Sequence, residues 1–68
     1  MYTYYYVLMT IMFSINGTVI VHEETVNSTV KDYAMQDCLN EVTRYDKFYG
    51  EDLISFSCKH AGNSNGEE

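Results

Sequence analysis

The sequence contains no proline and only four lysine or arginine residues among its 68 positions. The absence of proline is compatible with a compact chain of regular elements, because proline disrupts helix and sheet hydrogen bonding. Ten acidic residues give a net charge of −6, which repels nucleic-acid phosphates. We therefore expect no direct binding to nucleic acid. Such a surface either keeps the chain soluble or engages a basic site on another protein.

The apolar stretch YYYVLMTIMFSI has few features of a secretion signal or a membrane anchor. No Lys or Arg precedes Asn16 and no Ala-x-Ala-like site follows it, so we expect no cleaved signal. A membrane span needs about 20 apolar residues, but this run ends at Asn16 and is interrupted by Thr10 and Ser14. Two Asn-x-Ser/Thr sequons, at Asn16 and Asn27, would suit a secreted glycoprotein, although a turn and a helix start explain the same residues.

A β-hairpin explains the opening stretch best. Asn16-Gly17 lies between two runs of strand-forming residues, which is the strongest short hairpin signal. A two-residue turn there places Phe13 opposite Ile20. The first face then carries Val7, Met9, Ile11, Phe13, Ile15 and Ile20, and the second carries Tyr4, Tyr6, Leu8, Met12, Val19 and Val21. A strand that is apolar on both faces is typical of the centre of a sheet.

A helix and a third strand are predicted after the hairpin. In the segment VNSTVKDYAMQDCLNEVTRYDKF, apolar residues recur every three or four positions, with Asn27, Ser28 and Thr29 as candidate N-caps. The apolar stripe consists of Ala34, Met35, Cys38, Leu39, Val42 and Tyr45. The segment DLISFSCKH then alternates, with Ile54, Phe56 and Cys58 on one face and Leu53, Ser55 and Ser57 on the other.

Together these elements predict an α+β domain of ββαβ topology. A right-handed crossover through the helix would leave the second and third strands parallel, with the first strand between them and a sheet order of 2-1-3. We expect the domain to span residues 1–60 and residues 61–68 to form a flexible acidic tail.

One helix can cover only one face of such a sheet, so the other face is expected to bind a partner. Tyrosine suits such a surface because it offers a large contact area with one polar tip. The acidic side of the helix is a second candidate contact. The predicted partner-binding residues are Tyr4, Tyr6, Leu8, Met12, Val21, Asp37 and Glu41.

Two cysteines and two histidines are the residues most able to carry chemistry. Cys38, Cys58, His22 and His60 could supply four zinc ligands, but the closely spaced pairs of structural zinc sites are missing. Cys38 and Cys58 should both face the core, either bonded to each other or, as we expect, reduced. The sequence has no phosphate-binding loop and no hydrolase motif, so we expect neither catalysis nor a cofactor.

Three segments, YYVLMTIMFSING, MQDCLNEV and ISFSCKH, resemble a family of small uncharacterised proteins encoded by lambdoid prophages and tailed phages. The shared features are an apolar first strand, a tight Asn-Gly turn, one Cys in the helix and a second Cys in the last strand. The resemblance implies a bacterial cytoplasm, reduced thiols and an early phage gene product that acts on a host protein.

The expected function is therefore that of a small phage-encoded binding protein. It would inhibit a host defence protein, such as a nuclease or helicase, by occupying a surface as an acidic mimic of nucleic acid, and it could form a homodimer. Two alternatives from other classes are a secreted, disulfide-stapled effector or toxin-like protein and a structural component of an oligomeric particle.

Overall fold

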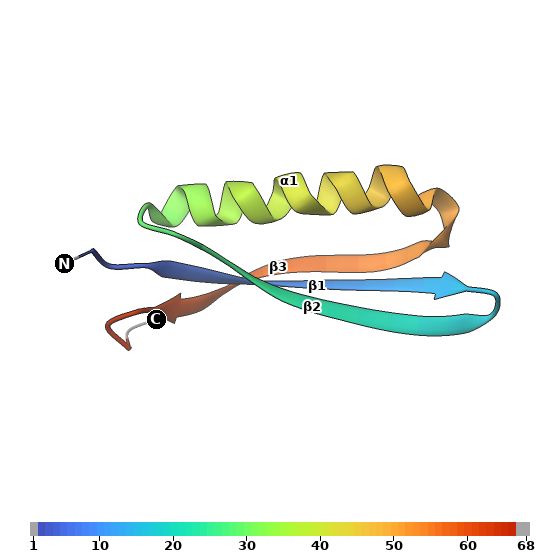
Figure 1. The fold of residues 1–68 in the computed structure, drawn as a ribbon, viewed down its shortest axis with the longest axis horizontal. Helices are drawn as coiled ribbons and strands as arrows, with labels where there is room; N and C mark the ends of the chain where they lie inside the picture. Colours follow the sequence, from blue (N-terminus) through green and yellow to red (C-terminus); the bar gives the residue numbers. More distant parts are fainter. Residues whose placement is uncertain (1, 67–68) are drawn as a thin grey trace.

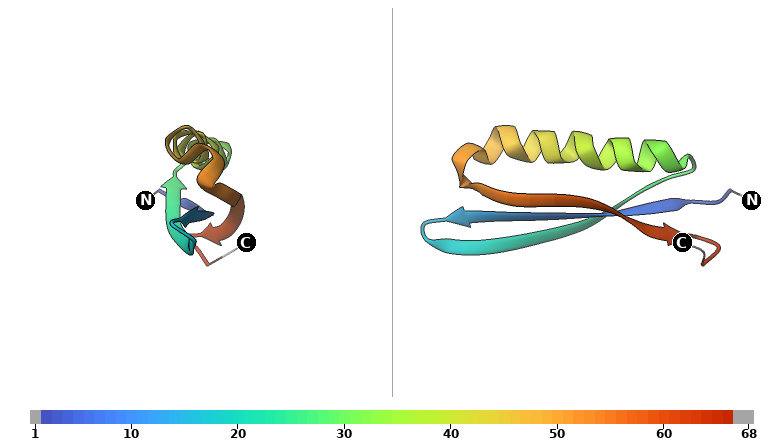
Figure 2. Two further views of the ribbon diagram at one scale, coloured as in Figure 1. Left: turned by 90° about the vertical axis from the view of Figure 1, so that its right-hand side faces the viewer. Right: turned by 180° about the vertical axis from the view of Figure 1, so that it is seen from behind.

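The protein is a three-stranded sheet with a single helix across one face, as seen in a computed structural model that describes residues 2–66. The elements are β1 (Tyr5–Ile15), β2 (Thr18–Ser28), α1 (Lys31–Tyr49), the short 3-10 turn η1 (Gly50–Asp52) and β3 (Leu53–Asn63). β1 is antiparallel to both neighbours, and the strand order is β2-β1-β3. Figures 1 and 2 show α1 lying along the sheet on one side. The predicted α+β fold, ββαβ topology and 2-1-3 order are confirmed.

The β1–β2 hairpin has the predicted register, with Phe13 opposite Ile20 and Ile15 opposite Thr18. Asn16 and Gly17 form the turn with φ values of 53° and 80°. These positive values belong to the left-handed region that asparagine and glycine tolerate best. The two long strands twist around each other, so that β2 crosses β1 in the view of Figure 1.

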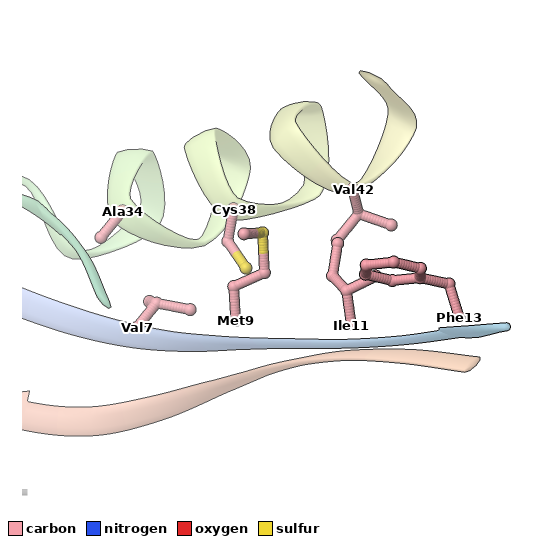
Figure 3. Packing of buried hydrophobic residues seen from close by; sticks show 7 residues of the cluster. All are labelled: Val7, Met9, Ile11, Phe13, Ala34, Cys38 and Val42. Carbon is pink, nitrogen blue, oxygen red and sulfur yellow. The ribbon is translucent and has the colours of Figure 1, made fainter. Parts of the chain in front are cut away.

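The core lies between β1 and α1. Within residues 2–66 the buried residues are Val7, Met9, Ile11, Phe13, Ala34, Cys38 and Val42. Figure 3 shows the three α1 side chains pointing down onto the four from β1. The β1 members alternate with half-buried residues, which agrees with a central strand whose second face is only partly covered.

The apolar stripe of α1 differs from the prediction at two positions. Leu39 is 43% exposed, so its predicted place in the core is wrong. Tyr49 completes the stripe instead, and its ring stacks on that of Phe13 with 4.2 Å between centroids. The helix continues to Tyr49, which brings this ring over the turn end of β1.

The predicted helix N-caps are also wrong. Asn27 and Ser28 belong to β2, where they pair with Tyr6 and Tyr5. The helix begins at Lys31, with Val30 in the N-cap position and no capping side chain. Ser28 contributes differently, since its Oγ accepts a hydrogen bond of 3.2 Å from the Val30 N–H. Strand pairing with β1 therefore takes precedence over capping here.

A bulge changes the faces of β3 near its start. The register with β1 shifts between Met12 and Phe13, which brings Leu53 opposite Phe13 and against the core. Strict alternation predicted the opposite face for Leu53, and it predicted a core position for Ile54, which is 53% exposed. An inserted residue reverses the alternation on one side of a bulge, and the sequence pattern carries no sign of it.

β3 also runs past residue 60, the predicted domain boundary, and ends at Asn63. Beyond it the Ser64 N–H donates a 2.8 Å hydrogen bond to the Tyr4 carbonyl, and the Tyr4 N–H donates a 2.9 Å bond to Ser64 Oγ. Residues 61–64 of the predicted tail are thus tied to β1. Positions 67 and 68 lie outside the described residues.

A disulfide joins α1 to β3 through Cys38 and Cys58, whose Cα atoms are 6.1 Å apart. Cys58 lies beside Met9 on the core face of the sheet, and Cys38 lies directly above Met9 (Figure 3). We expected reduced thiols, but the helix stripe and the strand alternation bring both sulfur atoms to one point of the core.

Candidate partner-binding surfaces

The seven predicted partner-binding residues lie on two separate surfaces. Tyr6, Leu8 and Met12 of β1 and Val21 of β2 share the face of the sheet that α1 does not cover. Asp37 and Glu41 lie on α1, on the other side of the sheet. Tyr4 precedes β1 and is held by Ser64 at one end of the molecule. No single flat partner can contact all seven at once.

The first surface, called here the uncovered face, has an apolar centre and a polar border. Its residues are Tyr6, Leu8, Thr10, Met12 and Ser14 of β1, Val19, Val21, Glu23 and Thr25 of β2, and Ser55, Ser57 and Lys59 of β3. The β1 side chains are half-buried between their neighbours, whereas Val19 and Val21 are 57% and 52% exposed. Among these residues one is acidic and one is basic, so the face is close to neutral.

The second surface, the acidic side, lies where α1 approaches β2. Burial raises the pKa of the Tyr45 hydroxyl, and the nearby charges of Glu24 and Glu41 and the neighbouring Tyr49 raise it further. Both carboxylates therefore lie close to Tyr45, one on β2 and one on α1. Asp37 lies one helical turn before Glu41 and is exposed.

One ion pair and one histidine–carboxylate contact lie on the acidic side. Arg44 Nη1 donates to Glu41 Oε1 at 2.9 Å, and His22 Nε2 lies 3.5 Å from Glu24 Oε2. The His22 ring also lies 5.7 Å from that of Tyr45, which fixes β2 against this part of the helix. Exposed pairs such as these contribute little to stability, but they restrict the side chains that border a contact.

An aromatic groove of about 330 Å³ opens at the C-terminal end of the acidic side. Its lining residues are Glu41, Arg44, Tyr45, Phe48 and Tyr49. The Tyr45 and Tyr49 rings are nearly parallel, with centroids 6.1 Å apart, and Phe48 meets Tyr49 edge-on at 4.9 Å. Phe48 is 81% exposed, the most open large apolar side chain among the described residues.

Sequence reasoning did not select Phe48 or Tyr49 for this surface. The available signal was their spacing, since they follow Tyr45 by three and four positions and must share its side of a helix. The prediction ended the apolar stripe at Tyr45, although Phe48 lay within the predicted helical segment and Tyr49 directly followed it. The acidic and aromatic parts of the helix in fact form one continuous surface.

Other kinds of site have less support. Within residues 2–66, no group of three His, Cys, Asp or Glu side chains is placed to hold a metal ion. Both cysteines of the proposed zinc set are consumed by the disulfide. No helix in the described part of the chain is long and apolar enough to cross a bilayer.

Comparison with known proteins adds no assignment: no protein-family model matches the chain, and no curated protein or solved structure matches it. The two surfaces must therefore be interpreted from their own chemistry.

Proposed function

We propose that this chain is a small binding protein that inhibits another protein by occupying one of its surfaces through the acidic side of α1. The observation that carries the proposal is that α1 presents the exposed Asp37 and the half-buried Glu41 beside an aromatic groove that Glu41 itself lines. Aromatic side chains are enriched among the few residues that carry most of the binding energy at protein interfaces. In this proposal the chain acts by binding and not by catalysis.

The partner that fits this surface is a basic protein site, such as the nucleic-acid channel of a host defence nuclease or helicase. The carboxylates of Asp37 and Glu41 would occupy the positions that phosphates hold in the partner's channel. The Phe48 ring would insert between basic residues of that channel. The net charge of −6 would speed encounter with such a site. As the phage resemblance implies, this partner would be a protein of a bacterial host cytoplasm.

Reversing the charges of the acidic side should weaken this interaction. We expect Asp37→Lys with Glu41→Lys to lower the affinity for a bacterial protein captured by the immobilised chain by about tenfold or more at low salt. The measurement is titration of the captured protein against each variant at about 50 and 300 mM salt. The same captured protein should lose its binding to DNA or RNA as the wild-type chain is added.

A matched control uses the same charge change elsewhere on α1. Asp32 and Asp46 each lie five positions from Asp37 or Glu41, which turns them well away from the acidic side. Asp32→Lys with Asp46→Lys should therefore retain most of the affinity. Equal losses in the two double variants, or binding that is indifferent to salt, would count against the proposal.

A second candidate function is favoured by the Cys38–Cys58 disulfide. Stable disulfides are typical of secreted proteins, and a small secreted effector or toxin-like protein would need such a staple. We expect alkylation of the chain in freshly lysed source cells, followed by intact mass measurement, to separate the two candidates. Two alkylated thiols would support the cytoplasmic inhibitor, whereas an unalkylated chain with a shortened N-terminus would support the secreted effector.

A further inference from the structure

The uncovered face has no covering element within the described part of the chain, although a row of apolar side chains runs along its centre. Tyr6, Leu8 and Met12 lie along β1, and Val19 and Val21 extend the apolar surface onto β2. Thr10 interrupts the row, and its polar border is formed by Glu23 and Thr25 of β2 and by Ser55, Ser57 and Lys59 of β3. An apolar centre with a polar border is the usual anatomy of a protein interface.

We propose that the uncovered face binds a second copy of this chain, so that two sheets pack face to face with a two-fold axis running along β1. This proposal concerns a different surface from the acidic side and does not depend on it. The two helices would lie on the outside of a four-layered dimer, which is a common way for two half-covered sheets to bury their apolar faces.

Charge is the first argument for a second copy. The chain carries a net charge of −6, so two copies repel each other over most of their surfaces. The uncovered face is the exception, because its single carboxylate, Glu23, is balanced by its single ammonium group, Lys59. Two copies can therefore approach through this face with less repulsion than a chain of this net charge would otherwise produce.

The positions of those two charges are the second argument. Glu23 lies on β2 opposite Thr10, and Lys59 lies on β3 opposite Leu8, which is two residues from Thr10 along β1. A two-fold axis along β1 places β2 of one copy over β3 of the other. Each Glu23 then lies within reach of the flexible Lys59 side chain of the other copy. The two-fold axis produces two such Glu23–Lys59 pairs in the dimer.

The same axis brings apolar groups together at the centre. β1 of one copy lies over β1 of the other and runs in the same direction, so Leu8 and Met12 meet their own counterparts on the axis. A two-fold axis across the strands would instead lay β2 on β2 and bring the two Glu23 carboxylates close together. Like charges in contact oppose association, which favours the axis along β1.

The size of the face indicates a weak, reversible dimer. Three strands of 11 residues each cover roughly 14 Å by 36 Å, or about 500 Å² per copy. Specific interfaces bury at least about 1,000 Å² in total, so this contact lies at the lower limit. Dissociation in the micromolar range or weaker is expected, and experiments must span that range of concentration.

Charge reversal on the uncovered face tests the proposal. We expect Glu23→Lys alone, and Lys59→Glu alone, to raise the dimer dissociation constant by about tenfold, as measured by sedimentation equilibrium at low salt. The chain with both changes should recover the wild-type value within about threefold, because the pair is re-formed in reverse. Circular dichroism of each variant verifies that the fold is retained, and Lys59→Glu serves if Glu23→Lys does not fold.

The two single changes distinguish a specific pair from general repulsion. Glu23→Lys lowers the overall negative charge, so nonspecific repulsion predicts stronger association, whereas the proposed pair predicts weaker association. Asp37→Lys makes the same charge change on α1 and should not weaken the dimer. A wild-type chain that stays monomeric up to about 1 mM, a Glu23→Lys variant that associates more tightly, or a double variant that is not rescued would each overturn the proposal.

Discussion

Replacing Cys38 and Cys58 together by alanine is expected to lower the free energy of unfolding by about 3 kcal/mol. The two cysteines are 20 positions apart, and their bond closes a loop formed by the second half of α1, η1 and the start of β3. Without it, the unfolded chain gains the entropy of that loop. A domain of 68 residues has little stability with which to offset this loss.

Thermal unfolding followed by circular dichroism measures the effect, and the midpoint should fall by more than about 10 °C. A reductant supplies the matched comparison. It should lower the midpoint of the wild-type chain by a similar amount and leave the double alanine variant unchanged. Equal midpoints for oxidised wild type and double variant would mean that the packing of α1 on β1 suffices without the bond.

The second large effect is expected for Ile11→Ala, which should lower the free energy of unfolding by about 2–5 kcal/mol. Ile11 is fully buried, lies at the middle of the central strand, and is packed between both neighbouring strands and α1. With only seven buried residues in the described chain, neighbouring side chains have little freedom to fill the cavity.

Leu39→Ala is the matched control for this change. It removes an aliphatic group of similar size from α1, but Leu39 is 43% exposed. The substitution should therefore lower the free energy of unfolding by about 1 kcal/mol or less. Denaturant titration of both variants gives the comparison. Similar losses would indicate that the helix is rotated so that Leu39 packs onto the sheet.

The parts of the fold that follow from local pattern were predictable. Asn16-Gly17 defined the hairpin and its register, because few residue pairs tolerate two successive positive φ values. The apolar character of β1 on both faces indicated a central strand, and with a single helix it led to the observed 2-1-3 order. The face carrying Tyr6, Leu8 and Met12 was identified for the same reason.

The features that the sequence did not reveal depend on contacts between distant segments. The bulge at Ile54 appears only in the pairing of β3 with β1, and no local motif marks it. Asn27 and Ser28 could cap a helix or pair in a strand, and only the length of β1 decides between the two. The aromatic groove was missed because the predicted apolar stripe stopped at Tyr45, whereas the stacking of Tyr49 on Phe13 extends that stripe by a further turn.

The position of β1 in the sheet has a consequence for how the chain folds. β1 can pair with β2 early, through a turn of two residues, but its other edge must wait until β3, the last strand, has been made. Until then β1, an apolar strand, exposes one row of unpaired backbone N–H and C=O groups to other molecules. If β3 pairs slowly with this edge, the newly made protein is exposed to aggregation. Docking of α1 onto β1 before β3 pairs would reduce that exposure.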